Sequence, residues 1–281
     1  MALEKVSTIL KMADAANTSA IAFNCNDFTM AYSVVTAAEE LGKPVIVMLY
    51  PADQFKSNAA NLSGFAATVR ELASKVKVPV GLHLDHCSDF DYILKAIQSG
   101  FTSVMFDGSM LPVEENIVLT KKVVDAAHAL GADVEAELGR VGFAAQSDQA
   151  DLDLYTKPEV AAKFCADTGV DSVAVAIGSA HGVYLETPRL DLERLDAIDA
   201  ATGTPLVLHG GSGIPDDQLE QAFRRGINKF NVGTEYFQLY YDSIRAFCRA
   251  NGDKGNVLDL PLFVQERMLA YLRVKLQLSR L

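Results

Sequence analysis

Eight short runs typical of β-strands alternate along this chain with segments that have apolar residues at helical spacing. Strands regularly separated by helices form a parallel sheet, and eight is the number of strands that closes a (β/α)8 barrel. At 281 residues the chain is long enough to form such a barrel as a single domain. The predicted strands are residues 19–25, 43–50, 78–86, 101–108, 132–139, 171–178, 204–210 and 228–235.

An α/β (β/α)8 TIM barrel over residues 1–281 is therefore the predicted fold. An open doubly wound sheet is the alternative, but no glycine-rich GxGxxG turn follows the first predicted strand. Residues from about 251 to 281 form a predicted C-terminal helical extension, in which a polar linker precedes a final helix. Its segment LFVQERMLAYLRVKL has enough apolar surface to pack either on its own barrel or on a partner subunit.

Composition and charge limit the partners of the chain. A net charge of −11 argues against nucleic acid and acidic membranes, since both attract a basic face. No window of about 18 uninterrupted apolar residues occurs, so we expect no membrane span. The N-terminus lacks the apolar core of a signal peptide, and the four cysteines show neither CxxC spacing nor a disulfide framework. We therefore expect a cytoplasmic protein.

Histidines and carboxylates gather at the predicted carboxyl ends of the strands, where a barrel has its active site. A single histidine of this kind is more often a hydrogen-bonded structural residue. Three of the five histidines share this rim, however, and three protein ligands with one open position are the pattern of catalytic zinc. The rim residues are Asp85, His86, Asp107, Glu135, Glu137, His181 and His209.

The other two histidines have weaker claims to a metal. His83 lies on the same strand face as Asp85 but deeper, so we predict a structural role or one beside the metal ligands. Direct ligation by His83 is the less favoured alternative. His128 falls within a helical segment, and we predict no role for it.

Two glycine-containing turns predict a phosphate site. HGGSG (209–213) follows the seventh predicted strand and offers backbone N–H groups with little steric cover, together with the Ser212 hydroxyl. FNVGTE (230–235) presents Asn231, Gly233 and Thr234 at the end of the eighth. Barrels often bind phosphate with the loops after these two strands, which favours binding over a tight helix start alone.

These motifs resemble those of the class II, zinc-dependent aldolases of the fructose-bisphosphate and tagatose-bisphosphate group. The resemblance implies a (β/α)8 barrel and the reversible cleavage of a ketose 1-phosphate or ketose 1,6-bisphosphate. The implied products are dihydroxyacetone phosphate and an aldehyde, formed through a zinc-stabilised enediolate. The matching segments, within residues 5–240, are LHLDHCSDFDYILKAIQSGFTSVMFDGSMLPVEENI, VEAELGRVG, AVAIGSAHGVY, LVLHGGSGIPDD and INKFNVGTE.

Matched position by position, the resemblance implies roles for the rim residues. His86, His181 and His209 would hold one catalytic Zn²⁺, and Asp85 would be the general acid/base. Asp107 and Glu137 match a second site for a divalent or monovalent cation, or its surroundings. The implied phosphate-binding residues are Gly182, Gly210, Ser212, Asn231 and Thr234, and the implied specificity residues are Asn24, Tyr50 and Gly233.

The chain departs from the family pattern at three places. The loop after Glu137, RVGFAAQSDQADLD, lacks the glutamate that the family uses to move a proton. Its second predicted strand ends in MLYPAD rather than in a serine-containing turn. Leu185 replaces the lysine of the HGxYK pattern. Ala144 and Ala145 stand where acids are expected, and the possible substitutes, which we leave open, are Gln146, Asp148, Asp151 and Asp153.

These departures bear on the substrate. Gly233 is typical of the tagatose branch, since the fructose branch has an acidic residue there. We therefore expect a substrate other than fructose 1,6-bisphosphate: a tagatose-type sugar, or a 1-phosphate with a carboxylate or sulfonate tail. Arg267, Arg273 and Arg280 could reach a neighbour's site, although a solvated helix face is favoured.

Two other functions remain open, together with the oligomeric state. One is a zinc-dependent barrel enzyme of another class, such as a hydrolase or an epimerase, which would not release dihydroxyacetone phosphate. The other is a non-catalytic aldolase-like subunit, which would have no need for Asp85 and all three rim histidines. We expect the chain to form a homodimer or homotetramer.

Overall fold

Eight parallel strands form a closed ring in the computed structural model, which describes residues 3–51, 60–139, 142–143, 155–182, 184 and 187–281. The strands follow one another around the ring in chain order, and the pairing of β4 with β5 completes it. This closure confirms the predicted barrel and excludes the open sheet. The strands are β2 (Ala20–Asn24), β3 (Val45–Leu49), β4 (Val80–Cys87), β5 (Ser103–Phe106), β6 (Asp133–Leu138), β8 (Ser172–Val175), β10 (Leu206–Leu208) and β11 (Ile227–Val232).

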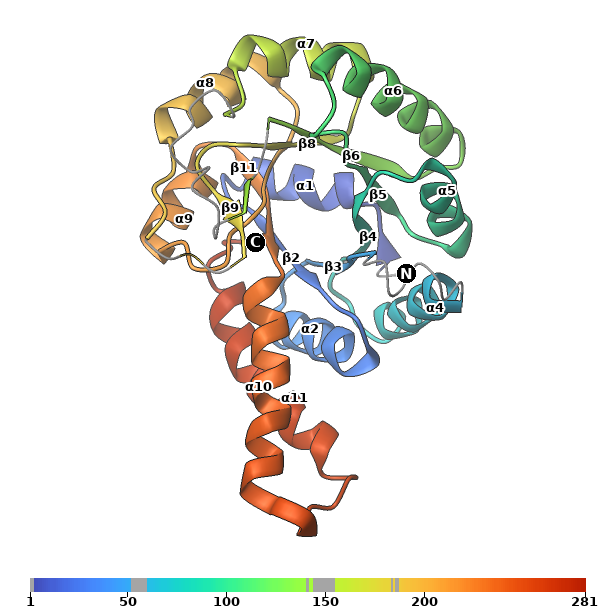
Figure 1. Ribbon diagram of the computed structural model, residues 1–281, viewed down its shortest axis with the longest axis vertical. Helices are drawn as coiled ribbons and strands as arrows, with labels where there is room; N and C mark the ends of the chain where they lie inside the picture. The colour runs from blue at the N-terminus through green and yellow to red at the C-terminus, as the bar shows by residue number, and fades with distance from the viewer. Residues whose placement is uncertain (1–2, 52–59, 140–141, 144–154, 183, 185–186) are drawn as a thin grey trace.

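Helices that connect the strands cover the outside of the ring (Figure 1). Several begin at an aspartate whose side chain accepts a hydrogen bond from a backbone N–H of the first turn, as Asp27 does from Met30. Several also end at a glycine in the left-handed conformation, such as Gly42 with φ 67°. The helices are α2 (Phe28–Leu41), α4 (Ala60–Ala73), α5 (Phe90–Ser99), α6 (Val113–Ala129), α7 (Pro158–Thr168), α8 (Leu192–Thr202), α9 (Asp216–Arg224) and α10 (Thr234–Asn251).

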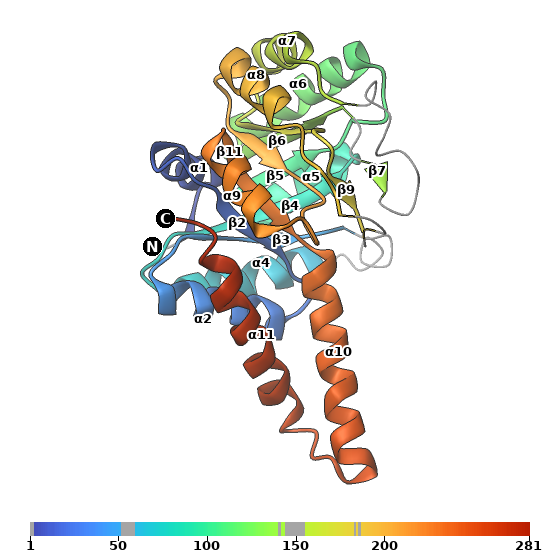
Figure 2. The same cartoon turned by 90° about the vertical axis from the view of Figure 1, so that its left-hand side faces the viewer.

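The N-terminal end of the barrel is closed by helix α1 (Val6–Ala15), which the sequence analysis did not predict (Figure 2). The short strand β1 (Leu3–Glu4) precedes it and pairs with β4. The helix buries one apolar face against side chains inside the barrel. This separate cluster contains Val6, Ile9, Leu10 and Ala13 from α1, and Ala20, Ala22, Ile46 and Met48 from β2 and β3.

The predicted final helix forms the returning arm of a helical hairpin that projects from the barrel (Figures 1 and 2). Helix α10 runs outward, and a short 3-10 helix, η3 (Gly252–Lys254), follows. Helix α11 (Leu260–Leu276) then returns and packs against α2. An ion pair between Arg273 Nε and Glu40 Oε2, at 2.8 Å, joins α11 to α2.

A second, two-stranded sheet lies at the end of the barrel opposite α1 (Figure 2). Its strands, β7 (Gly142–Phe143) and β9 (Ala180–His181), are parallel and were not predicted. None of the described helices has the length and the apolar composition that crossing a lipid bilayer requires.

Candidate active site

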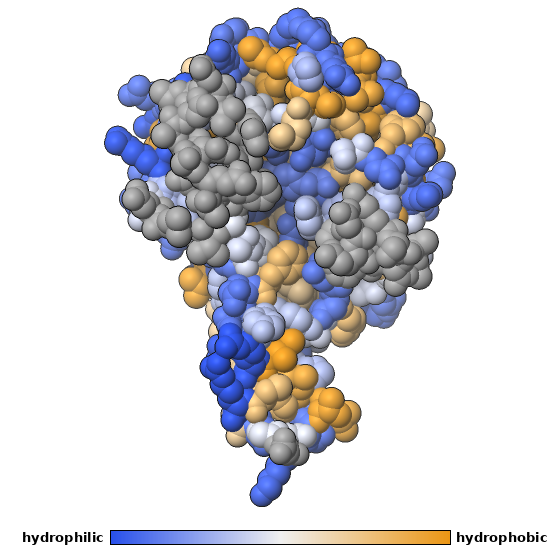
Figure 3. All heavy atoms as spheres, viewed as in Figure 1, coloured by the Kyte–Doolittle hydropathy of each residue, from blue (hydrophilic) through white to orange (hydrophobic). Residues whose placement is uncertain are grey.

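A cavity of about 990 Å³ opens at the carboxyl ends of the barrel strands. In Figure 3, hydrophilic residues occupy the hollow at the centre of the ring. The position is that of the active site in enzymes with this fold. The cavity is lined by Asn24, Tyr50, Asp85, His86, Ser88, Phe106, Asp107, Ser109, Met110, Leu111, Leu119, Glu137, Gly182, Gly210, Gly211, Ser212, Asn231, Gly233, Thr234 and Phe237.

Asp85, at the end of β4, is held between two amide side chains. Its two carboxylate oxygens accept hydrogen bonds from Asn24 Nδ2 at 2.8 Å and from Asn231 Nδ2 at 3.1 Å. Burial alone would raise the pKa of Asp85, but the positive charges of His86 and His209 lower it below its usual value. Asp85 is therefore an ionised carboxylate that faces the cavity.

His86 follows Asp85 directly, yet both residues line the same cavity. In a regular strand, neighbouring side chains point to opposite faces. Here the register between β4 and β5 shifts between Leu84 and Cys87, and His86 has a left-handed backbone with φ 39°. A bulge of this kind redirects a side chain, and a positive φ in a residue other than glycine often marks a functional position.

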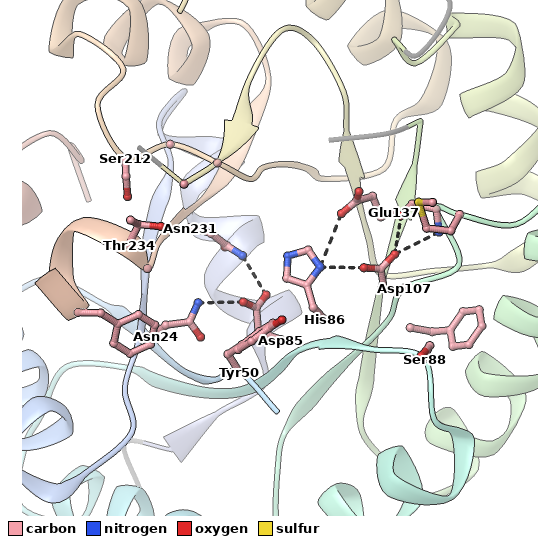
Figure 4. Close-up of a pocket in the computed structure, with 18 of the residues that line it drawn as sticks. Asn24, Tyr50, Asp85, His86, Ser88, Asp107, Glu137, Ser212, Asn231 and Thr234 are labelled. Atoms are coloured by element: carbon pink, nitrogen blue, oxygen red, sulfur yellow. Dashed lines mark hydrogen bonds and ion pairs between the residues drawn. The ribbon is translucent and has the colours of Figure 1, made fainter. Parts of the chain in front are cut away.

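Carboxylates surround the imidazole of His86 (Figure 4). Its Nδ1 lies 2.9 Å from Asp107 Oδ2 and 3.9 Å from Glu137 Oε2. Burial lowers the pKa of His86, but Asp85 and the bond to Asp107 outweigh burial and raise it above its usual value. The same contact lowers the pKa of Asp107, against the effect of its own burial.

His209 lies just below the cavity, fully buried between two carboxylates. Its Nε2 is 2.9 Å from Glu135 Oε1, and its Nδ1 is 3.1 Å from Glu137 Oε2. Burial lowers the pKa of His209, but hydrogen bonds to Glu135 and Glu137 raise it to about 10. Its ring centroid is 4.6 Å from that of His86, so the two imidazoles are neighbours.

Glu135, which contacts His209, also pairs with a buried lysine, and together these side chains form a polar layer inside the barrel. Its Oε2 lies 2.8 Å from Lys229 Nζ and 3.8 Å from His83 Nε2. His83 Nδ1 contacts Ser103 Oγ at 2.8 Å. Burial first, and then the charge of Lys229, lowers the pKa of His83 to about 3. His83 is thus a neutral, hydrogen-bonded residue beside the site.

The sequence analysis missed Lys229 and Ser103 as parts of this layer. A signal existed for Lys229, because it stands two residues before Asn231 and so lies on the same face of a strand. A lysine that points into a barrel needs a buried counter-charge.

The donor groups fit a divalent cation. Ligand atoms of Asp85, His86 and His209 lie within 4.8 Å of one another, and those of His86, Asp107 and Glu137 form a second such group. Two imidazoles with nearby carboxylates are suitable ligands for zinc and for related metals. The backbone of the predicted third ligand, His181, forms β9, and its side chain lies outside the described part of the structure.

The residues predicted to bind phosphate all line the cavity, and Figure 4 shows Ser212, Asn231 and Thr234 together on one side of it. Gly182 directly follows β9, and Gly210 lies in the turn after β10. Asn231 ends β11, and Thr234 begins α10, so the N-terminus of this helix faces the cavity. Ser212 Oγ accepts a hydrogen bond from the backbone N–H of Glu235 at 3.3 Å. Helix N-termini and glycine turns of this kind favour anions.

The predicted specificity residues also line the cavity. Tyr50 is 44% exposed, and its ring meets that of His86 edge-on at 6.2 Å between centroids. At Gly233, a Cβ would lie 3.3 Å from Asn24 Nδ2, so a larger side chain there would press on a partner of Asp85. The departures at Ala144, Ala145, Gln146, Asp148, Asp151, Asp153 and Leu185 lie outside the described residues.

Other charged residues that were considered lie away from the cavity. His128 Nε2 contacts Asp171 Oδ2 at 2.8 Å on the protein surface. Arg267 Nε donates to Ser243 Oγ at 3.1 Å, and Arg273 pairs with Glu40 on α2. Neither arginine, nor Arg280, is among the residues that line the cavity of this chain.

The sequence analysis also missed several residues that line the cavity. They are Ser88, Phe106, Ser109, Met110, Leu111 and Leu119. Their only sequence signal was position, since most of them follow β4 or β5 at its carboxyl end. Within the part of the chain that the structure describes, no lysine or arginine lines the cavity.

Comparison with known proteins identifies relatives of this chain. The family model for class II fructose-bisphosphate aldolases matches residues 4–278. The D-tagatose-1,6-bisphosphate aldolase subunit GatY of Klebsiella oxytoca is 39% identical over 234 residues, which are 83% of this chain and 81% of that protein. The crystal structure of the YdjI aldolase from Escherichia coli K12 matches with a TM-score of 0.87 and 35% identity, over 99% of this chain and 97% of the other.

A more distant structure supports the fold alone. Fructose-bisphosphate aldolase from Campylobacter jejuni matches with a TM-score of 0.82 at 24% identity, over 98% of this chain and 93% of that one. The overall fold is therefore shared at low sequence identity.

Proposed function

Because the chain belongs to the class II fructose-bisphosphate aldolase family, we propose that it reversibly cleaves a ketose 1-phosphate or ketose 1,6-bisphosphate into dihydroxyacetone phosphate and an aldehyde. Family membership makes the chain an aldolase, a lyase that acts on a carbon–carbon bond. One observation carries the proposal. An ionised Asp85 and two imidazoles meet at a cavity whose other side has glycine turns and a helix N-terminus.

His86 and His209, with His181 as the predicted third ligand, would hold a divalent cation, which we propose to be zinc. Such a cation supplies Lewis-acid stabilisation of the negative charge that develops on the ketone as the bond breaks. Asp107 and Glu137, on the other side of His86, are the proposed residues of a second cation site or its surroundings.

Asp85 is the proposed general base of the cleavage direction. Its carboxylate is ionised, so it can accept the proton of the substrate's C4 hydroxyl as the C3–C4 bond opens. Asn24 and Asn231 fix both carboxylate oxygens, which sets the direction from which the proton arrives. General-base catalysis of this kind typically contributes about 10²–10⁴-fold in rate.

The phosphate of the ketose is proposed to bind at Gly182, Gly210, Ser212, Asn231 and Thr234. The positive end of the α10 dipole favours the dianion there. A phosphate held at this end places the ketone next to His86, because these groups line one cavity, and His209 lies directly beside His86.

The tail of the substrate is proposed to extend along the far side of the cavity. Asp107 and Ser88 lie on the side of the cavity away from Ser212 and Thr234 (Figure 4), and no lysine or arginine is among the described lining residues. We propose a substrate other than fructose 1,6-bisphosphate: a tagatose-type sugar, or a 1-phosphate with a carboxylate or sulfonate tail. Gly233, which lines the cavity at the position where the fructose branch has an acidic residue, supports this proposal.

Release of dihydroxyacetone phosphate tests the function directly. Metal-loaded protein is incubated with tagatose and fructose 1,6-bisphosphates and with 1-phosphates that have carboxylate or sulfonate tails, and release is followed by coupled oxidation of NADH. We expect release that a chelator abolishes. Absence of release from every sugar, with metal at full occupancy, would contradict the proposal and favour another metal-dependent reaction or a non-catalytic subunit.

We also propose that the chain assembles as a homodimer or homotetramer through its helical hairpin. The named relative from Klebsiella oxytoca is itself a subunit. Large apolar residues are exposed where the hairpin turns: Val257, Leu258 and Leu262 are 72%, 76% and 66% exposed (Figure 3). Light scattering after size exclusion should give a multimer, and Leu258→Asp with Leu262→Asp should shift it toward the monomer.

A further inference from the structure

Tyr184 connects the two turns that border the phosphate side of the cavity. Its hydroxyl accepts a hydrogen bond from the backbone N–H of Ala180 at 2.6 Å and donates one to the backbone carbonyl of Gly210 at 2.7 Å. Burial raises the pKa of Tyr184 to about 12, so the hydroxyl keeps the proton that it donates. Tyr184 itself is not among the residues that line the cavity.

The Ala180 N–H and the Gly210 carbonyl, which Tyr184 connects, lie next to predicted site residues. Ala180 directly precedes His181 and Gly182, and Gly210 directly follows His209. The strands that lead into these turns, β8 and β10, are hydrogen-bonded neighbours. One hydroxyl therefore joins the backbones that present the predicted phosphate-binding glycines of both turns.

The two turns also touch directly, so an added side-chain atom would push them apart. A Cβ at Gly210 would lie 2.4 Å from the Ala180 carbonyl oxygen, and Gly210 has a φ of 65°. A Cβ at Gly213 would lie 3.3 Å from the ring of Tyr184. The turns thus approach each other closely because Gly210 has no side chain. The Tyr184 hydroxyl holds them together through its two hydrogen bonds.

We propose that Tyr184 is a positioning residue that fixes the distance between these two turns and thereby sets the affinity of the site for the phosphate end of the substrate. This inference rests on the proposed function for the identity of the ligand, a phosphate monoester. It adds a residue that acts through Ala180 and Gly210 rather than by contact with the substrate.

The first test replaces the hydroxyl alone. Tyr184→Phe keeps the ring and removes both hydrogen bonds, each of which typically contributes a factor of about 2 to 12 in an equilibrium constant. The dissociation constant of inorganic phosphate, measured by calorimetry on metal-loaded protein, should rise by up to the product of the two factors, about 4- to 140-fold. If the protein turns over a ketose phosphate, KM should rise by a similar factor while kcat changes much less.

The control is Tyr240→Phe, which removes the hydrogen bond of another half-buried tyrosine to Asp27; neither of these two residues lines the cavity. It should leave phosphate affinity unchanged. Phosphate affinity within twofold of the wild type in folded Tyr184→Phe would overturn the inference, and so would an equal loss in Tyr240→Phe.

Hydrogen exchange on the wild-type chain gives a second test that needs no variant. The amide of Ala180 should exchange slowly, and more slowly still with inorganic phosphate bound. Fast exchange that phosphate leaves unchanged would contradict the role of Tyr184. Neither measurement depends on turnover, so a chain that cleaves no ketose phosphate would defeat the proposed function while phosphate binding still tested Tyr184.

Discussion

The two halves of the barrel interior differ in kind although the same strands build both. On β2 the inward-facing positions run from Ala20 and Ala22 to Asn24, and on β4 from Gly81 to Asp85. The N-terminal half is apolar and sealed by α1 (Figure 2). The carboxyl-terminal half is a layer of buried acids, histidines and one lysine, open to the cavity above.

This difference separates stability from chemistry within one fold. The apolar half requires only complementary shape, because burial of hydrocarbon surface is favourable wherever it packs well. In the polar half each buried charge loses hydration, and it persists because a partner of opposite charge lies close, as Glu135 lies beside Lys229. Substitutions in the two halves should therefore affect different properties.

The largest expected effect is on turnover, at the top of the polar half. Asp85→Ala should lower kcat by about 10²- to 10⁴-fold, because the proposed base is removed, while metal content and fold remain. The matched control is Asp91→Ala, which removes an exposed carboxylate from the first turn of the adjacent helix α5. Unchanged turnover in Asp85→Ala would remove this residue from the mechanism.

The next effect concerns stability in the polar half. Lys229→Met should leave Glu135 buried without its main counter-charge and cost about 3–5 kcal/mol in unfolding free energy, measured by urea denaturation. Adding Glu135→Gln should recover part of that loss, since the uncompensated charge is then gone. A double variant no more stable than the single one would mean that the ion pair does not carry the effect. The exposed Lys163→Met serves as the control.

In the apolar half we expect the opposite of the Asp85→Ala result: a loss of stability without a loss of turnover. Ile9 on α1 is fully buried, so Ile9→Ala should cost about 2–5 kcal/mol through lost burial and a residual cavity. Turnover of the folded protein should stay at the wild-type level, because α1 packs on the N-terminal parts of the strands, whereas the cavity is lined by residues at their carboxyl ends. A fall in kcat comparable to that of Asp85→Ala would show that the two halves are coupled.

The barrel strands and most of the polar residues at their carboxyl ends could be predicted from the sequence, because these features depend on local patterns. The run VPVGLHLDH was predicted as a strand at 78–86 and forms β4 at Val80–Cys87. Helix α1 was missed although Val6, Ile9, Leu10 and Ala13 have helical spacing, because the pattern covers only ten residues and the two-residue strand β1 before it is too short to indicate a βα unit.

The missing parts of the site depend on tertiary contacts. Lys229 meets Glu135 across 94 positions of the chain, a distance over which local patterns carry no information. The adjacent Asp85 and His86 were both assigned to the site, but the bulge that turns both toward the cavity could not be inferred. It depends on the register between β4 and β5 and on a positive φ at His86.

The smallest predicted effect lies where the apolar half meets α1. Gly81 faces this helix, and a Cβ there would lie 2.9 Å from Val6 Cγ2 and 3.3 Å from Ile46 Cγ1. Overpacking typically costs about 1–3 kcal/mol, whereas replacing glycine by alanine in an extended strand regains about 0.4–1 kcal/mol from the unfolded chain. Gly81→Ala should thus be destabilising by about 0–2.5 kcal/mol with full turnover.

A second substitution that makes room for the new methyl group tests whether overpacking against Val6 causes the loss of stability. In a Val6→Ala background the nearest obstacle to the Gly81→Ala methyl group is absent, so the same substitution should become neutral or stabilising. Urea denaturation of the four proteins in this cycle measures the coupling free energy. Zero coupling would mean that the contact with Val6 relaxes freely, and that α1 follows changes in the apolar half instead of constraining them.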